Sequence, residues 1–127
     1  METTADIRSG DGTVDALLAA QAEAWRRGDA DAVAAGFAED AEFVSPIETY
    51  RGRAAIRKAA AGFFAYAARV EIELRRAWTD GRHGVVEWAW REEARDGGAV
   101  RRADDAIVFE VRNARFVAWR EYVNWRD

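Results

Sequence analysis

The hydrophobic pattern of the chain changes near residue 69, and this change constrains the fold more than any other feature. Before it, apolar residues such as Val14, Leu17 and Leu18 recur three and four positions apart, as on one face of a helix. After it, apolar and polar residues alternate up to Trp125, which is typical of strands with one buried face. Helices followed by strands predict an α+β domain in which the helices cover one face of a mainly antiparallel sheet.

Local signals divide the chain further. A first helix is expected over 13–27, capped within Asp11–Thr13 and ended by Gly28-Asp29, and a short second helix should carry Val33 and Phe37. Next we expect a strand at 41–45 that ends at Pro46 and a helix at 53–67 after Gly52. Four strands follow: one contains Val70, Ile72, Leu74 and Trp78, the second contains Val86, Trp88 and Trp90, the third covers 100–111, and the last begins at 114.

Composition narrows the function. The 127 residues suit one domain, which we place at 13–127 behind a flexible leader at 1–12. There is no cysteine and a single histidine, so disulfides, thiolate metal sites and multi-histidine metal sites are excluded, and we predict neither a metal nor a cofactor. A net charge of −4 gives no reason to expect nucleic acid as a partner.

The sequence also bears on the cellular compartment of the protein. No apolar run approaches the roughly 18 residues of a membrane span, and the first residues lack the basic and apolar regions of a secretory signal. We therefore predict a cytoplasmic protein without a membrane partner. Arginine replaces lysine almost everywhere, Lys58 being the only lysine, which suits a GC-rich bacterial genome.

The last strand carries the most informative residue. Val117, Trp119, Val123 and Trp125 share one parity, and Glu121 is the only polar member of that row. A carboxylate in an apolar row must be paired, protonated or directed into a cavity. Glu121 is therefore the first candidate for catalysis, and a structural ion pair with an arginine is the alternative.

Asp105 is the second candidate. In the stretch 103–109, Asp105 shares parity with Ile107 and Phe109, whereas Asp104 shares it with Ala106 and Val108, so that one acid must point inward. Two acids in one apolar cavity push their pKa values apart and thereby provide a proton donor and a base. The alternative is a cap, or a pair with Arg101 or Arg102.

Aromatic side chains are numerous, with six tryptophans, and are first of all core residues. An aromatic cavity also suits a flat, apolar organic ligand held at a few polar points. The predicted substrate-binding residues are Gln21, Trp25, Phe43, Ser45, Phe63, Trp88, Trp90, Glu92, Ile107 and Trp119, in which Gln21 and Ser45 are polar handles and Glu92 lies at the mouth or on a solvated strand end.

Residues 22–57 contain Gly28-Asp29, Phe37-Ala-Glu-Asp-Ala41, Pro46 and Gly52, and resemble the opening of the nuclear transport factor 2-like superfamily, especially its SnoaL-like branch. Residues 109–122 resemble the last hairpin of that family. The resemblance implies a strongly curved sheet around helices, a cone with a deep pocket, and dimerisation through the sheet. It also implies a role for Glu121, because limonene-epoxide hydrolases carry an acid just after Trp-Arg, here Trp119-Arg120.

Other family residues are replaced. The base and the oxyanion acid of ketosteroid isomerases correspond here to Ser45 and Ile107, and the water-binding residues and arginine of the epoxide hydrolases to Phe43, Ser45 and Trp90. We therefore predict a homodimeric, cofactor-independent cyclase, isomerase or dehydratase of secondary metabolism that acts on a small apolar substrate such as a polycyclic compound. The alternatives are a non-catalytic small-molecule binder, an epoxide hydrolase, or a fully packed dimerisation module.

Overall fold

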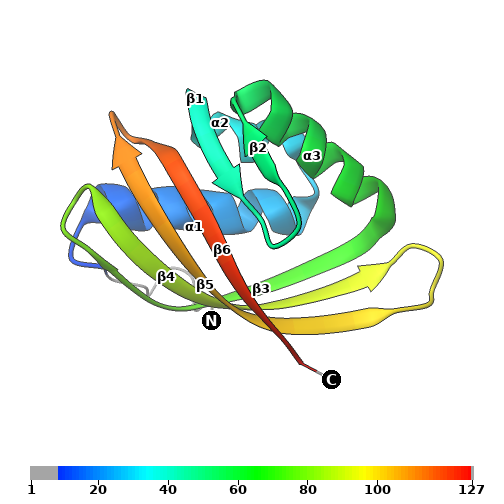
Figure 1. Ribbon diagram of the computed structural model, residues 1–127. Helices are drawn as coiled ribbons and strands as arrows, with labels where there is room; N and C mark the ends of the chain where they lie inside the picture. Colours follow the sequence, from blue (N-terminus) through cyan, green and yellow to red (C-terminus); the bar gives the residue numbers. More distant parts are fainter. Residues whose placement is uncertain (1–8, 127) are drawn as a thin grey trace.

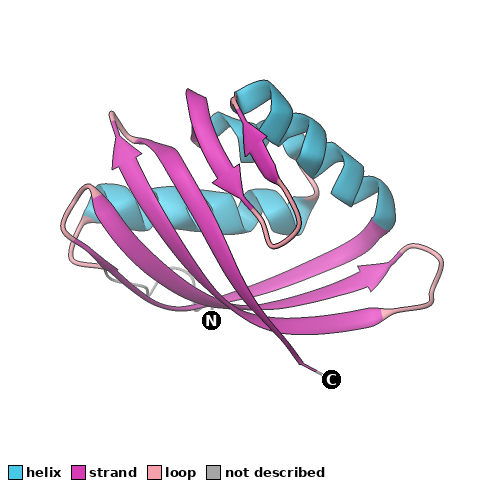
Figure 2. Cartoon of the chain, in the orientation of Figure 1, coloured by secondary structure: helices cyan, strands magenta, loops and turns pink. Residues whose placement is uncertain are grey.

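The computed structural model describes residues 9–126. Three helices come first, α1 (Gly12–Arg27), α2 (Ala30–Ala35) and α3 (Arg53–Tyr66), interrupted by β1 (Phe37–Val44) and β2 (Thr49–Arg51). The chain then continues as β3 (Ala67–Thr79), β4 (His83–Ala94), β5 (Val100–Arg112) and β6 (Arg115–Arg126). Figure 2 shows the helices on one side of a long, bent sheet, which confirms the predicted α+β class.

Short polar signals set the helix ends as expected. The Asp11 carboxylate accepts the backbone N–H groups of Thr13 and Val14 and so caps α1, while Asp29 caps α2 through the N–H of Ala32. Gly28 ends α1 with φ of 65°, a left-handed conformation that glycine adopts without strain. Helix α1 begins at Gly12, inside the predicted leader, of which residues 1–8 lie outside the described part of the chain.

The sheet has the strand order β2-β1-β6-β5-β4-β3. The run β3–β6 is an antiparallel meander, as predicted, and β1 joins its edge by pairing parallel to β6 and antiparallel to β2. Figure 1 shows the sheet curving around the helices, with the ends of β4 and β5 nearest their connecting loop extending beyond them. That extension creates an end of the sheet that the helices do not fill.

Three local expectations were wrong. Phe37 begins β1 instead of lying in the second helix, and β1 is longer than the predicted 41–45 strand. Trp78 is 54% exposed because the pairing of β3 with β4 shifts register between Leu74 and Arg76, which turns the following residues over. Phe116 shares parity with Ala118 and Tyr122, which predicts the outer face of the sheet, but it is fully buried because a similar shift between Glu110 and Val111 reverses its side.

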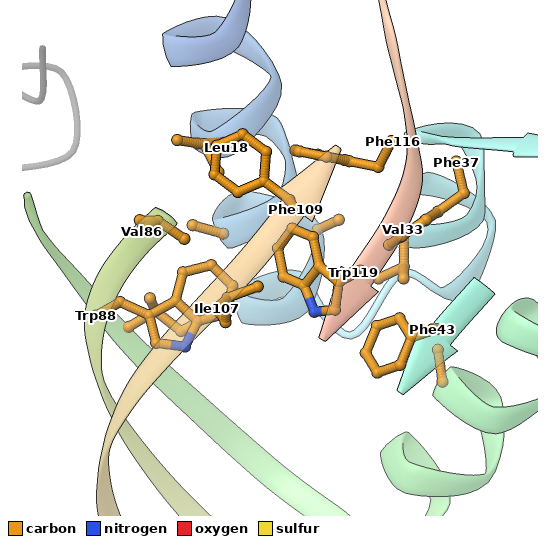
Figure 3. Packing of buried hydrophobic residues seen from close by; sticks show 14 of the residues in the cluster. Leu18, Val33, Phe37, Phe43, Val86, Trp88, Ile107, Phe109, Phe116 and Trp119 are labelled. Carbon is orange, nitrogen blue, oxygen red and sulfur yellow. The ribbon is translucent and has the colours of Figure 1, made fainter. Parts of the chain in front are cut away.

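The apolar core lies between the helices and the concave face of the sheet. Figure 3 shows Leu18 of α1 against Phe109 of β5, and Trp119 of β6 beside Phe43 of β1. The largest fully buried residues are Trp88, Trp119, Phe37, Phe109, Phe116, Leu18, Ile56 and Ile107. Within the described residues, no helix is long and apolar enough to cross a membrane.

Candidate active site

Three carboxylates on the concave face each accept a hydrogen bond from an indole. The Nε1 atom of Trp119 donates to Oε2 of Glu121 over 3.1 Å. That of Trp90 donates to Oε1 of Glu92 over 2.8 Å. In both cases the acid follows the tryptophan by two positions on one strand, so that strand geometry places both side chains on the same face.

The third pair joins two strands. Trp88 of β4 lies directly opposite Asp105 of β5, and its Nε1 atom donates to Oδ2 of Asp105 over 3.0 Å. In Figure 3 the nitrogen atoms of the Trp88 and Trp119 rings point away from Leu18 and Phe116, so that the rings pack in the core and their donors face the acids. Asp105 is therefore the inward acid of its strand, as implied by the match of Ile107, two positions along, to the inward acid of the ketosteroid isomerases.

No basic side chain pairs with these acids. Within the described part of the chain, neither Glu92, Asp105 nor Glu121 belongs to an ion pair. Each accepts a hydrogen bond from an indole, and Glu92 has a further side-chain hydrogen bond with Tyr66 of α3. The adjacent Asp104, which faces outward, does pair with Arg126 and Arg75. The predicted alternative, in which arginines neutralise the inward acids, therefore does not describe this geometry.

Burial weakens the acidity of two of the groups. It raises the pKa of Glu121 to about 7, against the opposing effect of the Trp119 hydrogen bond, and the charge of Asp105 adds to the rise. Burial likewise raises the pKa of Asp105 to about 6, opposed by the Trp88 hydrogen bond and helped by the charges of Asp104 and Glu92. A carboxyl with such a pKa is present in both protonation states near neutral pH.

The acids open onto a cavity of about 320 Å³. Eight of the predicted site residues line it: Trp25, Phe43, Ser45, Phe63, Trp90, Glu92, Asp105 and Glu121. They come from α1, α3, β1 and the turn after it, and β4, β5 and β6, so the cavity is formed only when the helices meet the sheet. Its size corresponds to the lower range of small-molecule sites.

Four predicted residues do not line the cavity. Trp88, Ile107 and Trp119 are almost fully buried beneath it, where the two tryptophans hold their acids. Gln21 is also buried, because its side-chain amide donates to the carbonyl of Val33 over 2.8 Å and accepts from Nε1 of Trp25 over 3.1 Å. Gln21 therefore orients a wall residue and has no free polar group for a ligand.

Ser45 is at the rim but is already engaged. Its hydroxyl donates to the carbonyl of Glu48 and accepts the backbone N–H groups of Ile47 and Glu48, which closes the turn between β1 and β2. Glu92, in contrast, is only 4% exposed, so the alternative of a solvated strand end was wrong.

Several residues that line the cavity were not among the predicted site residues. Tyr50 lies on the unpredicted strand β2, and Ile47 on the turn before it. Arg101 and Trp125 form the rim together, with the guanidinium carbon 3.7 Å from the centre of the indole ring. The parity of β5 and β6 places both residues in the inward rows, and this was the signal available for them in the sequence.

The described residues contain no cluster of three or more histidine, cysteine, aspartate or glutamate side chains arranged to hold a metal ion. The chemistry that these side chains can perform themselves is proton transfer, because Glu121 is partly exposed and contacts the cavity directly.

Solved structures of similar fold have low sequence identity to this chain. A protein with a ketosteroid isomerase-like fold from Catenulispora acidiphila, solved with trimethylamine, is 22% identical over 84% of this chain and 83% of its own, with a TM-score of 0.78. An LEH-like epoxide hydrolase of M. tuberculosis is 21% identical over 86% and 80%, with a TM-score of 0.75. SalBIII, an epoxide hydrolase/cyclase-like enzyme of pyran ring formation in the polyether salinomycin, is 20% identical over 92% and 95%, with a TM-score of 0.78.

These identities establish the fold alone, and a search of curated proteins by sequence gives no match. The family assignment comes from the sequence profile of the SnoaL-like domain, which matches residues 18–119. That range runs from within α1 through α2, α3 and β1–β5 to Trp119 in β6. The chain belongs to the SnoaL-like domain family.

Proposed function

We propose that the protein is a cofactor-independent enzyme that transfers a proton on an apolar organic substrate, as in a cyclisation, isomerisation or dehydration of secondary metabolism. The observation that carries the proposal is the environment of Glu121, which contacts the aromatic cavity, accepts a single indole hydrogen bond and has no ion-pair partner among the described residues. Glu121 is the proton-transferring group in this proposal, and Asp105 is its partner.

The two acids have complementary properties. Because the pKa of Glu121 is about 7 and that of Asp105 about 6, the cavity can hold one ionised and one protonated carboxyl near neutral pH. On the paired strands, Glu121 lies opposite Ile107, two positions from Asp105, so the two acids are diagonal neighbours on one face. A substrate between them would meet a base and an acid.

A benzisoxazole tests this without a known substrate, since its ring opens when a base removes a carbon-bound proton. We expect the protein to accelerate ring opening, with the rate rising as pH passes through about 7. Glu121→Gln should lower the rate by roughly 10²–10⁴-fold at unchanged fold, the usual share of general acid–base catalysis.

The matched control is Glu110→Gln, which removes a carboxylate of the outer face that pairs with Arg82. This variant should keep the full rate. A Glu121→Gln protein that is folded and equally fast would remove Glu121 from the mechanism. If Glu121→Gln unfolds the protein instead, the carboxylate is structural, and the proposal also fails.

The rival function is a non-catalytic binder. It requires inward acids held by arginines, and the ion pairs seen among the described residues involve other carboxylates. Epoxide hydrolysis is the second rival, supported by the fold of SalBIII and by Glu121 after Trp119-Arg120, although Trp90 occupies the place of that family's arginine. An epoxide substrate that yields a diol, rather than a cyclised product, would favour it.

A homodimer through the outer sheet face is part of the proposal. Trp78, Val85 and Val108 lie side by side across β3, β4 and β5, and Tyr122 lies on β6, with exposures of 54% for Trp78, 41% for Val108 and 55% for Tyr122. Such an apolar surface favours burial against a second copy. Sedimentation should show a dimer at micromolar concentration and a monomer for Val108→Glu; a wild-type monomer would contradict this.

A further inference from the structure

We propose that the ligand of this cavity carries a positively charged nitrogen, as a protonated or quaternary alkylamine, with its charge between the carboxylates and the aromatic walls. This inference rests on the proposed function and narrows its substrate class: the organic substrate is apolar except for one cationic nitrogen. The proposal is carried by the unbalanced charge of the cavity, by an unpartnered buried carboxylate oxygen, and by the arrangement of its rings.

The charge of the cavity is the first step. Glu92, Asp105 and Glu121 contact the same space, and the only basic side chain of the lining is Arg101. Indole N–H groups supply each acid with one hydrogen bond but no charge. Ionised carboxylates away from water need an opposite charge, and among the described residues the lining supplies one, Arg101, for three carboxylates.

Asp105 makes this need specific. Its side chain is 8% exposed, and Oδ2 accepts the Trp88 hydrogen bond, while Oδ1 is buried without any partner. A buried polar atom left unpaired costs free energy, and such atoms are rare in folded proteins. A cationic group in the adjacent cavity would compensate the charge of this carboxylate.

The walls are the second step. Trp25, Phe63 and Trp90 meet one another at ring-centre distances of 5.7–5.9 Å, in edge or tilted contacts. All three line the cavity, with Phe43 on the neighbouring side. The faces of aromatic rings attract alkylammonium groups, and more strongly where water is excluded.

The rim already shows the same chemistry. The guanidinium of Arg101 lies over the ring of Trp125 at 3.7 Å, and Arg101 is paired in register with Glu92. A cation on an aromatic face beside a carboxylate is thus realised within the protein at the exposed edge. The inner acids, Asp105 and Glu121, have no such cation, and a ligand would provide it.

The test compares two probes of nearly equal shape. Phenyltrimethylammonium carries a permanent charge, and tert-butylbenzene is its neutral carbon analogue. We expect tryptophan fluorescence or calorimetry to show the cation binding roughly tenfold or more tightly at pH 8. Because the probe does not titrate, any pH dependence belongs to the protein.

The titratable groups that line the cavity are Glu92 from β4, Arg101 and Asp105 from β5, Glu121 from β6 and Tyr50 from β2. Tyr66 at the end of α3 adds a side-chain hydrogen bond to Glu92, and burial raises the pKa of its phenol, so it stays neutral in the pH range of the test. The acids with a pKa of about 6 and about 7 lose their protons as pH rises. Affinity for the cation should therefore increase between about pH 5 and about pH 8, whereas affinity for the neutral probe should stay constant or fall.

Variants locate the charge. Asp105→Asn should weaken the cation roughly tenfold and leave the neutral probe unaffected, and Glu121→Gln should act in the same direction. The matched control is Asp104→Asn, one residue away on the outer face, where the carboxylate pairs with Arg126. It removes a charge that raises the pKa of Asp105, so its effect on cation binding should be absent or opposite in sign.

The outcomes separate this inference from the proposed function. Tighter binding of the cation that depends on Asp105 and rises with pH supports the inference. Equal or tighter binding of tert-butylbenzene overturns it, while the Glu121-dependent ring opening of benzisoxazole would still support proton transfer. Binding of neither probe overturns the inference as well, and loss of the ring-opening activity alone would overturn only the proposed function.

Discussion

The concave face has two ends that differ in packing although the same strands build both. At the closed end, Phe109 and Phe116 are at most 1% exposed, and Figure 3 shows them beside Leu18 of α1. At the open end, the same inward rows carry Asp105, Glu121 and, further out, Trp125, which is 42% exposed. The rows are continuous, yet one end is core and the other is a site.

The difference shows what the helices decide. Where α1 and α2 cover the sheet, every inward residue of β5 and β6 is apolar. Where the two strands extend beyond this packed core, their inward rows contain acids, because these side chains adjoin a cavity. Trp88 and Trp119 connect the two ends, since their rings belong to the core and their N–H groups hold the acids. Rigid packing at the closed end thereby fixes the carboxylates at the open end.

The largest expected effect lies at the closed end. Phe109→Ala should reduce the free energy of unfolding by about 3–5 kcal/mol, because it leaves a cavity where the ring packs against Phe116. Val123→Ala, a matched truncation in the cavity wall, should cost less than about 1 kcal/mol because Val123 is already partly exposed. Urea denaturation of both variants measures the contrast, and equal losses would show that the two ends are packed alike.

The next effect is the pH dependence of stability at the open end. The folded protein holds protons on Glu121 up to about pH 7, whereas unfolded glutamate releases its proton near about 4.3. The free energy of unfolding should therefore fall as pH rises from about 4 to about 7, because the folded state binds more protons in that window. Glu121→Gln should lack the part of this pH dependence that comes from Glu121. At pH 8 its free energy of unfolding should exceed that of the wild type by on the order of 1–3 kcal/mol.

Thermal unfolding of the two proteins across that window measures the difference. It isolates Glu121 from Asp105, whose pKa of about 6 lies in the same range. Parallel curves for the wild type and Glu121→Gln would show that the carboxyl is solvated and that its pKa is ordinary.

The smallest effect is expected at the rim. Ser45→Ala should cost about 0.5–1.5 kcal/mol of stability, because the hydroxyl closes a turn, and should change the affinity for cavity probes less than about twofold. Calorimetric titration beside denaturation separates the two quantities. A large loss of affinity without a loss of stability would restore Ser45 as the polar handle that the sequence predicted.

Much of the fold could be predicted from local patterns. The caps at Asp11 and Asp29, the glycine that ends α1 and the turn residues each act over a few positions, so the sequence alone places the helices and the meander. Alternation placed Glu121 in the inward row and required one of Asp104 and Asp105 to face inward, since side chains on a strand alternate between faces. The match of Ile107 to the inward acid of the ketosteroid isomerases then selected Asp105. These inferences need no knowledge of what lies across the sheet.

Alternation failed where register changed. The two bulges reverse the faces of Trp78 and Phe116, and a bulge depends on how one strand fits its partner, not on either strand alone. Strand β2 was missed for a similar reason, because three residues pair with β1 only when the two meet.

The sequence by itself determined that the inward rows of the last two strands include Glu121 and one acid of the pair Asp104 and Asp105. Only the tertiary structure decided that indole N–H groups, and not arginines, bind those acids. It also decided that the side chain of Gln21 makes its hydrogen bonds within the core and that Arg101 lies at the rim of the cavity. The physical reason is the distance along the chain over which each effect acts. The face on which a side chain lies follows from the backbone geometry of one strand. The partner of a buried group, and hence its pKa, is set by residues that the fold brings together from distant parts of the chain.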